Sequence, residues 1–219
     1  MTQASSHALR GLLIAQFCGA FNDNAWKLMV ALLSIRQLSA VLAPGPELEA
    51  GSQAQTTLAF VVFTLPLALV SLVAGLLADR VSKRTVIIVM KGVEVLLMAT
   101  ATLALWLNPA GGILPLIVLG GMGIHSALFS PAKYGILAEL VPHEKLAASN
   151  GRLEMWTFLA ILTGTAAPGI LMSLTGDALW LAPLALFGLS LVGFTAAWTV
   201  PRVPPARAQG GLADTLGGG

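Results

Sequence analysis

The sequence predicts an all-α membrane protein with six transmembrane helices and both termini in the cytoplasm. Three observations predict this class: the apolar composition, the length of the apolar runs, and the distribution of basic residues between loops. Apolar residues make up 56% of the 219 residues and charged residues 10%, against about 25% charged residues in an ordinary soluble domain. Since hydrocarbon offers no hydrogen-bonding partner, each backbone amide must be paired within its own segment, and the apolar runs are predicted to be helices.

Six apolar stretches approach or exceed the roughly 20 residues that a helix needs to cross about 30 Å of hydrocarbon. We place these spans at residues 11–34, 56–77, 85–107, 112–131, 150–174 and 178–200. We divide the chain into a six-helix unit over residues 1–200 and a polar Gly/Pro/Ala tail over residues 201–219. Prolines inside the spans are interpreted as tolerated kinks, because neighbouring helices satisfy the freed carbonyl groups; they are Pro66, Pro115, Pro168 and Pro183.

Basic residues gather in one set of loops and in both terminal segments. The opposite loops hold only Arg36, beside the acidic residues Glu47, Glu49 and Asp177. An excess of Lys and Arg marks cytoplasmic loops, so both termini are predicted to be cytoplasmic, and the net charge of +2 needs no nucleic-acid partner. The nine basic residues on the predicted cytoplasmic side are Arg10, Arg80, Lys83, Arg84, Lys133, Lys145, Arg152, Arg202 and Arg207.

The first span carries polar residues about halfway along its length. Asn22, Asp23 and Asn24 are consecutive, and Lys27 follows one turn later. An Asp or Lys at the centre of a transmembrane helix costs about 2.5–3.5 kcal/mol, so these side chains are expected to face a protein interior or a water-filled path. We predict that all four are substrate-binding residues.

Charged and titratable residues also interrupt the third and fourth spans. Lys91 lies close enough to the cytoplasmic end of the third span to extend its ammonium group to the interface. Glu94 lies deeper and is either a proton carrier, which makes it a possible coupling residue, or simply the partner of Lys91. We interpret His125 as a structural histidine with its hydrogen bonds satisfied, and a proton relay is the alternative.

Small residues line one face of each of two spans. Such faces allow helices to approach closely, and van der Waals contact is the main attraction between helices in lipid. We interpret them as packing surfaces; they are Gly120, Gly121, Gly123 and Ala127 in the fourth span, and Thr165 and Gly169 in the fifth.

The loop between the second and third spans carries a specific signature, Gly75-Leu76-Leu77-Ala78-Asp79-Arg80-Val81-Ser82-Lys83-Arg84. It resembles the major facilitator superfamily signature Gly-x-Leu-Ala-Asp-Arg-x-Gly-Arg-Arg, with Ser82 where a second glycine is common. The resemblance implies one six-helix half of that fold, with Gly75 and Asp79 closing an inner gate against the other half. We extend the gating prediction to the basic residues Arg80, Lys83 and Arg84. The alternative is a cytoplasmic turn that is basic only because of its topology.

Two further segments narrow the resemblance. Phe129-Ser130-Pro131-Ala132-Lys133-Tyr134-Gly135-Ile136-Leu137-Ala138-Glu139-Leu140 follows the fourth span, and Asn150-Gly151 begins the fifth. Together with Phe21-Asn22-Asp23-Asn24, they resemble bacterial lysophospholipid transporters and the transporter domain that some bacteria fuse to a phospholipid acyltransferase. The resemblance implies that a lysophospholipid, such as lysophosphatidylethanolamine, moves inward across the cell inner membrane for re-acylation. The implied partners are the lipid substrate, membrane lipids and possibly an acyltransferase.

The polar residues of the first span fit such a substrate. Gln16, Gly19, Asp23 and Lys27 fall on one face of a helix. Asp23 and Lys27, four residues apart, either neutralise each other or bind the ammonium and phosphate of a zwitterionic headgroup. In the second case the flanking asparagines would bind the headgroup oxygens. An ion pair that only holds helices together is the alternative interpretation.

The length of the chain is the main difficulty for a transporter. Superfamily members usually have two six-helix halves related by an axis along the membrane normal, whereas this sequence supplies one. We expect either a missing C-terminal half or a second copy as partner. The interpretations are a truncated gene product, a piece of a longer protein, or a half-transporter that dimerises, and we favour a fragment.

Three other functions stay open. A proton-coupled exporter of small amphiphiles usually has a Gly-Pro pair in the fifth span, from which Ala167-Pro168-Gly169 departs. The chain is alternatively the membrane module of a bifunctional acyltransferase, or a scaffold without transport. Motifs of soluble enzymes and paired metal ligands are absent, so we predict no catalytic residue, cofactor or metal. The single cysteine, Cys18, lies in the first span and forms no disulfide framework.

Overall fold

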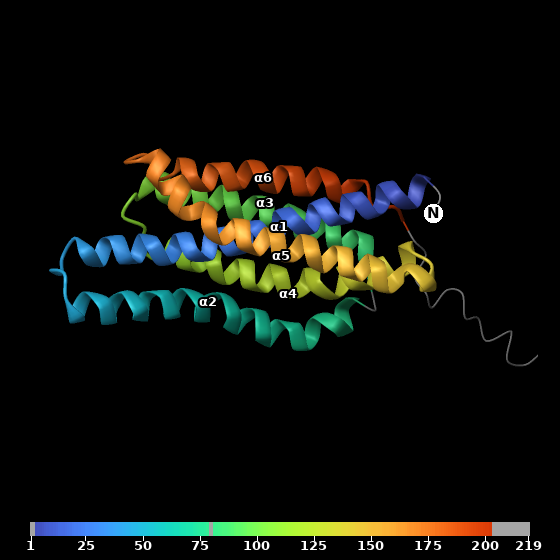
Figure 1. Cartoon of the computed structure of the whole chain (residues 1–219), viewed down its shortest axis with the longest axis horizontal. Helices are drawn as coiled ribbons and strands as arrows, with labels where there is room; N and C mark the ends of the chain where they lie inside the picture. The colour runs from blue at the N-terminus through green and yellow to red at the C-terminus, as the bar shows by residue number, and fades with distance from the viewer. Residues whose placement is uncertain (1–2, 79–80, 203–219) are drawn as a thin grey trace, which may run out of the picture.

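The structure, a computed structural model, describes residues 3–78 and 81–202, with side chains described for residues 9–75 and 81–202. The described residues form six α-helices that lie along the long axis of the molecule, each antiparallel to the next (Figure 1). Both ends of the described chain therefore lie at the same end of the bundle. The helices are α1 (Gln3–Ser39), α2 (Pro46–Ala78), α3 (Lys83–Leu107), α4 (Leu114–Leu140), α5 (His143–Thr175) and α6 (Leu181–Trp198).

The six predicted helices are confirmed, but most of them are longer than the predicted spans. Helix α4 continues through Pro131 to Leu140, although we expected the span to end at residue 131. Helix α5 begins at His143 rather than at residue 150. Hydropathy marks only the part of a helix that lies in hydrocarbon, and the backbone hydrogen-bond ladder continues into the polar turns on either side.

Two of the four predicted kinks lie where a proline breaks no hydrogen bond. Pro115 and Pro183 fall in the first turns of α4 and α6, and the amides of a first turn have no intrahelical acceptor. The kink interpretation is therefore wrong for these two. Pro66, Pro131 and Pro168 lie inside α2, α4 and α5, where a proline does remove a hydrogen bond.

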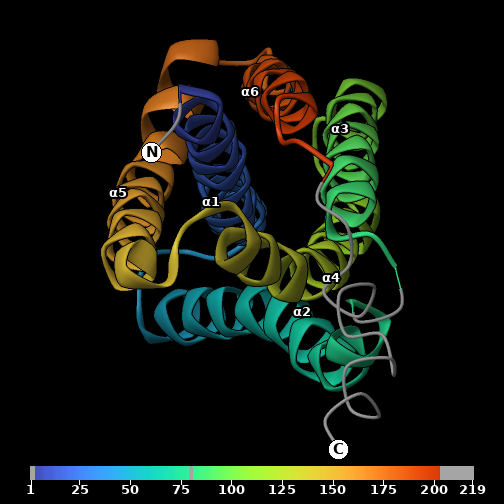
Figure 2. The same cartoon turned by 90° about the vertical axis from the view of Figure 1, so that its right-hand side faces the viewer.

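Within the described residues, five helices are long and apolar enough to cross a membrane, namely α2 to α6. Helix α1 does not meet that standard, because its polar residues interrupt the apolar run. It lies inside the bundle instead: α1 contacts α2, α4, α5 and α6, and Figure 2 shows it among the other helices. Central packing explains how α1 tolerates polar side chains, since they face other helices rather than lipid.

The small-residue face of α4 is confirmed at Gly121 and Gly123; a Cβ atom at Gly121 would lie 2.9 Å from Leu97 Cδ2 on α3. A Cβ atom at Gly123 would lie 2.2 Å from the backbone oxygen of Phe63, so α2 and α4 touch there through their backbones. The corresponding contact of α5 is made by Gly164, whose Cβ would lie 2.6 Å from the backbone oxygen of Phe21 on α1. The predicted α5 residues Thr165 and Gly169 are exposed, and no described atom lies within 4 Å of the Gly169 Cβ position, so packing at this face stays a prediction.

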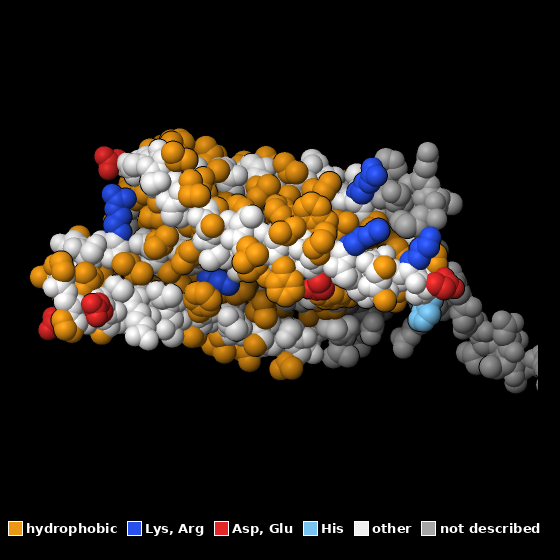
Figure 3. All heavy atoms as spheres, viewed as in Figure 1, with side chains coloured by type: hydrophobic (Ala, Val, Ile, Leu, Met, Phe, Trp, Pro, Cys, Tyr) orange, Lys and Arg blue, Asp and Glu red, His pale blue; other side chains and the backbone are white. Residues whose placement is uncertain are grey.

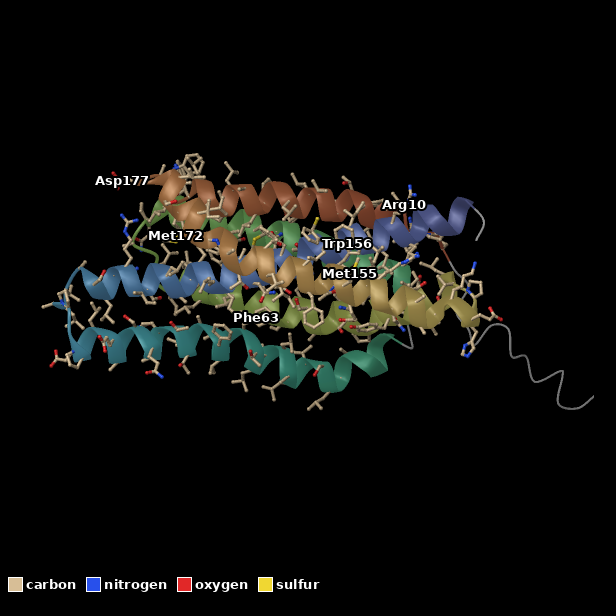
Figure 4. All side chains as sticks on the ribbon, viewed as in Figure 1. Arg10, Phe63, Met155, Trp156, Met172 and Asp177 are labelled. Atoms are coloured by element: carbon tan, nitrogen blue, oxygen red, sulfur yellow. The ribbon has the colours of Figure 1, made fainter. Side chains whose placement is uncertain are left out.

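Charged side chains lie mainly toward the two ends of the bundle, with an apolar surface between them (Figure 3). Arg10 lies at the end where α1 begins, and Asp177 lies at the opposite end (Figure 4). Arg36 approaches Asp177 to 3.9 Å, an exposed pair that contributes little stability. The basic and acidic loops thus lie at opposite ends of the bundle, as predicted, while the orientation in the membrane stays a prediction.

Candidate functional site: a charged cavity beside helix α1

A cavity of about 230 Å³ lies between α1, α2, α3 and α4. Its lining includes one acidic residue, Asp23, and two lysines, of which Lys133 is 8% exposed and Lys91 is 0% exposed. Most of the remaining wall is apolar or carries hydroxyl groups. The lining residues are Gln16, Gly19, Ala20, Asp23, Leu67, Ser71, Lys91, His125, Ser126, Ala127, Phe129, Ser130 and Lys133.

Asp23 is the predicted substrate-binding residue that reaches this cavity. The Ser126 hydroxyl of α4 donates a hydrogen bond of 2.5 Å to Asp23 Oδ2. The second carboxylate oxygen, Oδ1, is buried and accepts no hydrogen bond from any described residue. Gln16 and Gly19 line the same cavity, so the predicted polar face of α1 is confirmed for these three residues.

Lys27 does not share the cavity with Asp23, and the two side chains have different partners. The Lys27 ammonium donates to Asn24 Oδ1 at 3.2 Å and lies 4.7 and 4.8 Å from the ring centroids of Phe60 and Phe63. A cation over an aromatic face is attracted by the ring quadrupole, so α2 stabilises this ammonium. The spacing allowed Asp23 and Lys27 to form an ion pair, but this pair is not among the ion pairs of the described residues.

Asn22 points away from the cavity, into the core of the bundle. Its amide nitrogen donates to Glu94 Oε1 at 2.8 Å and to the Leu186 backbone oxygen on α6 at 3.2 Å. Asn24 bonds back to the Ala20 carbonyl of its own helix at 2.8 Å. The four predicted substrate-binding residues therefore do not form one site. Asp23 lines the cavity, Lys27 and its partner Asn24 lie toward α2, and Asn22 lies in the buried core.

Lys91 and Glu94 form a fully buried ion pair of 2.6 Å, with neither side chain exposed. The expectation that Lys91 extends to the interface is wrong, because its ammonium turns inward to this carboxylate and lies 5.0 Å from the Phe129 ring centroid. Glu94 had two interpretations, and the contact with Lys91 that one of them requires is confirmed. Its possible function in coupling stays a prediction.

His125 lies on the cavity wall beside this ion pair. Its Nε2 atom is 3.8 Å from Glu94 Oε2, beyond hydrogen-bonding distance. Neither ring nitrogen has a hydrogen-bond partner within the described part of the chain, although the side chain is only 2% exposed. The expectation of a satisfied structural histidine is therefore wrong.

The sequence analysis missed Ser126 and Lys133 as cavity residues. We counted Lys133 as a loop cation, but α4 continues through Pro131 and buries this side chain to 8% exposure. Ser126, Ser130 and Lys133 are spaced by four and three residues, which places them on one helix face. This spacing was the available signal, and the expected helix end at residue 131 obscured it.

Two of the predicted gating residues make contacts within this half. Lys83, at the start of α3, forms an ion pair with Glu139 near the end of α4. Position 135 is a glycine where a Cβ atom would lie 2.5 Å from Lys83 Cε, so the lysine crosses α4 at that point. Arg84 donates from Nε to the Val200 backbone oxygen at 2.6 Å, which satisfies a carbonyl beyond the end of α6.

The remaining gating residues make no such contact or are not described. Gly75 is exposed in the last turns of α2, and no described heavy atom lies within 4 Å of its Cβ position. Asp79 and Arg80 lie outside the described residues.

The fold belongs to a known class of membrane protein. Residues 12–215 match the Major Facilitator Superfamily, and the chain therefore belongs to that superfamily of transporters. It is a multi-pass membrane protein, in agreement with its apolar helices. The superfamily resemblance of the loop signature is thereby confirmed.

The chain is also similar to individual transporters. It is 31% identical to the lysophospholipid transporter LplT of Photorhabdus laumondii, over 94% of this chain and 46% of that protein. It is 34% identical to the transporters of the same name from Escherichia fergusonii and Salmonella typhimurium, again over 94% of this chain and 46% of each relative. The chain thus spans about half the length of the curated relatives it matches.

Proposed function

We propose that this chain binds a zwitterionic lysophospholipid, such as lysophosphatidylethanolamine, as part of a secondary transporter that moves it inward across the bacterial inner membrane. The similarity to proteins named lysophospholipid transporter supports the substrate class. Both termini would face the cytoplasm, as the basic loops indicate.

The observation that carries this proposal is that the side chains of Asp23 and Lys133, of opposite charge, line one cavity. The Asp23 carboxylate would pair with a substrate ammonium group, and Lys133 would supply a positive charge for a phosphate. The sequence analysis predicted that Lys27 binds the phosphate. Lys133 fits this role better because it lines the cavity, whereas Lys27 lies outside the cavity, beside Phe60 and Phe63 of α2. A volume of 230 Å³ is smaller than the roughly 300–1,000 Å³ of a drug-sized ligand site, which suits a headgroup better than a whole lipid.

The basic end of the bundle provides the proposed inner gate. The Lys83–Glu139 pair and the Arg84 bond to Val200 hold α3 against α4 and the end of α6. This arrangement would support the gating residues Gly75, Asp79 and Arg80 where they meet the other half.

The proposal needs a partner for this half. The relatives are about twice as long, which favours a C-terminal half as the partner, while a second copy of the chain is the alternative. A phospholipid acyltransferase would be the enzyme that consumes the transported lysophospholipid.

Binding of radiolabelled lysophosphatidylethanolamine to the purified protein in nanodiscs tests the proposal. We expect saturable binding that unlabelled lysophosphatidylethanolamine displaces. A monoacylglycerol with the same acyl chain lacks the charged headgroup and should not compete. Equal competition by the monoacylglycerol, or the absence of saturable binding, would reject headgroup recognition in this cavity.

A further inference from the structure

Lys27 carries a positive charge on α1 that no described carboxylate neutralises. The ion pairs of the described residues involve other side chains, and the Lys27 ammonium instead donates to Asn24 Oδ1 at 3.2 Å. A lysine in the middle of a transmembrane helix is costly unless it is compensated. This ammonium group is therefore suited to an anion that the described part of the chain does not supply.

Two aromatic side chains of α2 hold this ammonium group where a ligand can approach it. The ring centroids of Phe60 and Phe63 lie 4.7 and 4.8 Å from Lys27 Nζ. Phe60 is 46% exposed, and Lys27 itself is only partly buried. Aromatic faces stabilise a cation without supplying a negative charge. The contacts with α2 therefore position the lysine and leave its charge for another partner.

Lys27 and Lys133 follow one another along the long axis of the bundle, on opposite sides of Asp23. Helix α1 runs from the basic to the acidic end, and Lys27 comes one turn after Asp23, about 6 Å closer to the acidic end. Asp23 is bonded to Ser126 on α4, which runs the opposite way. Lys133 follows Ser126 by seven residues, about 10 Å closer to the basic end. An inward-moving lipid would therefore pass Lys27 before Lys133.

The Asp23 carboxylate makes the two lysine positions distinct. Lys133 lines the cavity together with Asp23, whereas Lys27 lies outside it. A lipid phosphate is attracted to each ammonium group and repelled by the carboxylate between them, and both effects are strong where the dielectric constant is low. One phosphate therefore pairs with one of the two lysines at a time.

We propose that Lys27 and Lys133 are successive phosphate-binding positions on the transport path: the lipid phosphate pairs first with Lys27, on the outer side of Asp23, and then with Lys133 in the cavity. This inference rests on the proposed function, because it requires a lysophospholipid that moves inward past Asp23. It assigns Lys27 a substrate contact outside the cavity. The contact involves only the phosphate, so it does not depend on the rest of the headgroup.

The test is a double-mutant cycle with Lys27→Met and Lys133→Met, read out as lysophosphatidylethanolamine affinity in nanodiscs. Methionine keeps an unbranched apolar side chain that packs well against the α2 aromatic rings. If the two positions are occupied about equally, Lys27→Met alone should lower the affinity only about twofold, because the phosphate still pairs with Lys133. In the Lys133→Met background the same substitution removes the remaining lysine of the pair and should lower the affinity by about tenfold.

Two control variants separate binding from structure. If Lys27 only held α1 against α2, its substitution would lower the affinity by the same factor in both backgrounds. Lys27→Arg keeps the charge and should restore the affinity in each background. Lys145→Met removes an exposed lysine from the first turn of α5 and should leave the affinity unchanged.

A second lipid identifies the group that the lysines bind. Lysophosphatidylglycerol carries the phosphate but no ammonium group, and it should show the same dependence on background. A dependence confined to lysophosphatidylethanolamine would overturn the inference, as would an effect of Lys27→Met that is no larger in the Lys133→Met background. Absence of saturable binding to the wild-type protein would instead reject the proposed function on which the inference depends.

Discussion

Ser126 on α4 donates a hydrogen bond to Asp23 on α1 and so joins the two helices across the cavity. The bond engages Oδ2 and leaves Oδ1 without a partner among the described residues. A buried carboxylate oxygen without a donor is costly, and a bound ammonium group would satisfy it. We propose that Ser126 orients the carboxylate for a ligand that would complete the site.

Ser126→Ala should weaken binding of lysophosphatidylethanolamine by about tenfold, because a hydrogen bond to a charged group contributes roughly 1.5–3 kcal/mol. Equilibrium binding in nanodiscs measures the effect. Ser126→Thr keeps the hydroxyl group and should restore most of the affinity. Ser34→Ala is a suitable control, since the Ser34 hydroxyl bonds only to the Val30 carbonyl of its own helix among the described residues. Equal affinity of the wild-type and Ser126→Ala proteins would exclude this orienting function.

Gly123→Ala should destabilise the protein by about 1–3 kcal/mol, the usual cost of overpacking. The added methyl group would lie 2.2 Å from the Phe63 backbone oxygen, so α2 has to move away from α4. Thermal unfolding in detergent measures the change as a lower Tm. The matched control is Gly169→Ala, whose methyl group meets no described atom within 4 Å. If both variants unfold at the same temperature, the close contact of α2 and α4 is not present in solution.

Arg84→Gln should loosen the end of α6. The guanidinium group bonds the Val200 carbonyl at 2.6 Å and stacks 5.7 Å from the centroid of the Trp198 ring. We expect a loss of about 1.5–3 kcal/mol, the range of hydrogen bonds to charged groups, and faster amide hydrogen exchange in the last turn of α6. Arg36→Gln, at the opposite end of the bundle, should leave that exchange unchanged. Unchanged exchange in Arg84→Gln would show that the arginine does not cap this helix.

The fold was largely predictable from the sequence, because apolar length and loop charge are properties of whole segments. The ends of the helices were not predictable, because hydropathy marks the part of a helix that lies in hydrocarbon, whereas the backbone hydrogen bonds continue beyond it. The error mattered most at Pro131, where an expected end concealed the rest of α4. It led us to assign Lys133 to a cytoplasmic loop, whereas the structure places it in the cavity lining.

The candidate site was predictable in part. Helical spacing correctly placed Gln16, Gly19 and Asp23 on one face. It did not reveal which neighbouring helix each side chain contacts. For this reason Asn22, which contacts Glu94, and Lys27, which contacts Phe60, were wrongly expected at the same site as Asp23. Partners more than 30 residues away in sequence, such as Glu94 for Asn22, follow from packing and not from local periodicity.

The predicted orientation has a direct test in cysteine labelling. Cys18 is 2% exposed and should not react with a membrane-impermeant maleimide, which gives a silent background. Ala110→Cys, in the turn between α3 and α4, should be labelled in intact spheroplasts. Glu144→Cys, in the first turn of α5, should be labelled only after permeabilisation. The reverse pattern would place the basic loops outside and contradict the predicted topology.

The central claim is that the Asp23 carboxylate in the cavity binds the ammonium group of the substrate, and affinity of the Asp23→Asn variant tests it most directly. Nanodisc binding of lysophosphatidylethanolamine should fall by about 100-fold, the usual scale for removing one partner of a buried charge pair. Protein abundance in the membrane should stay normal, and Asp177→Asn should bind like the wild-type protein. Wild-type affinity in Asp23→Asn would contradict the account.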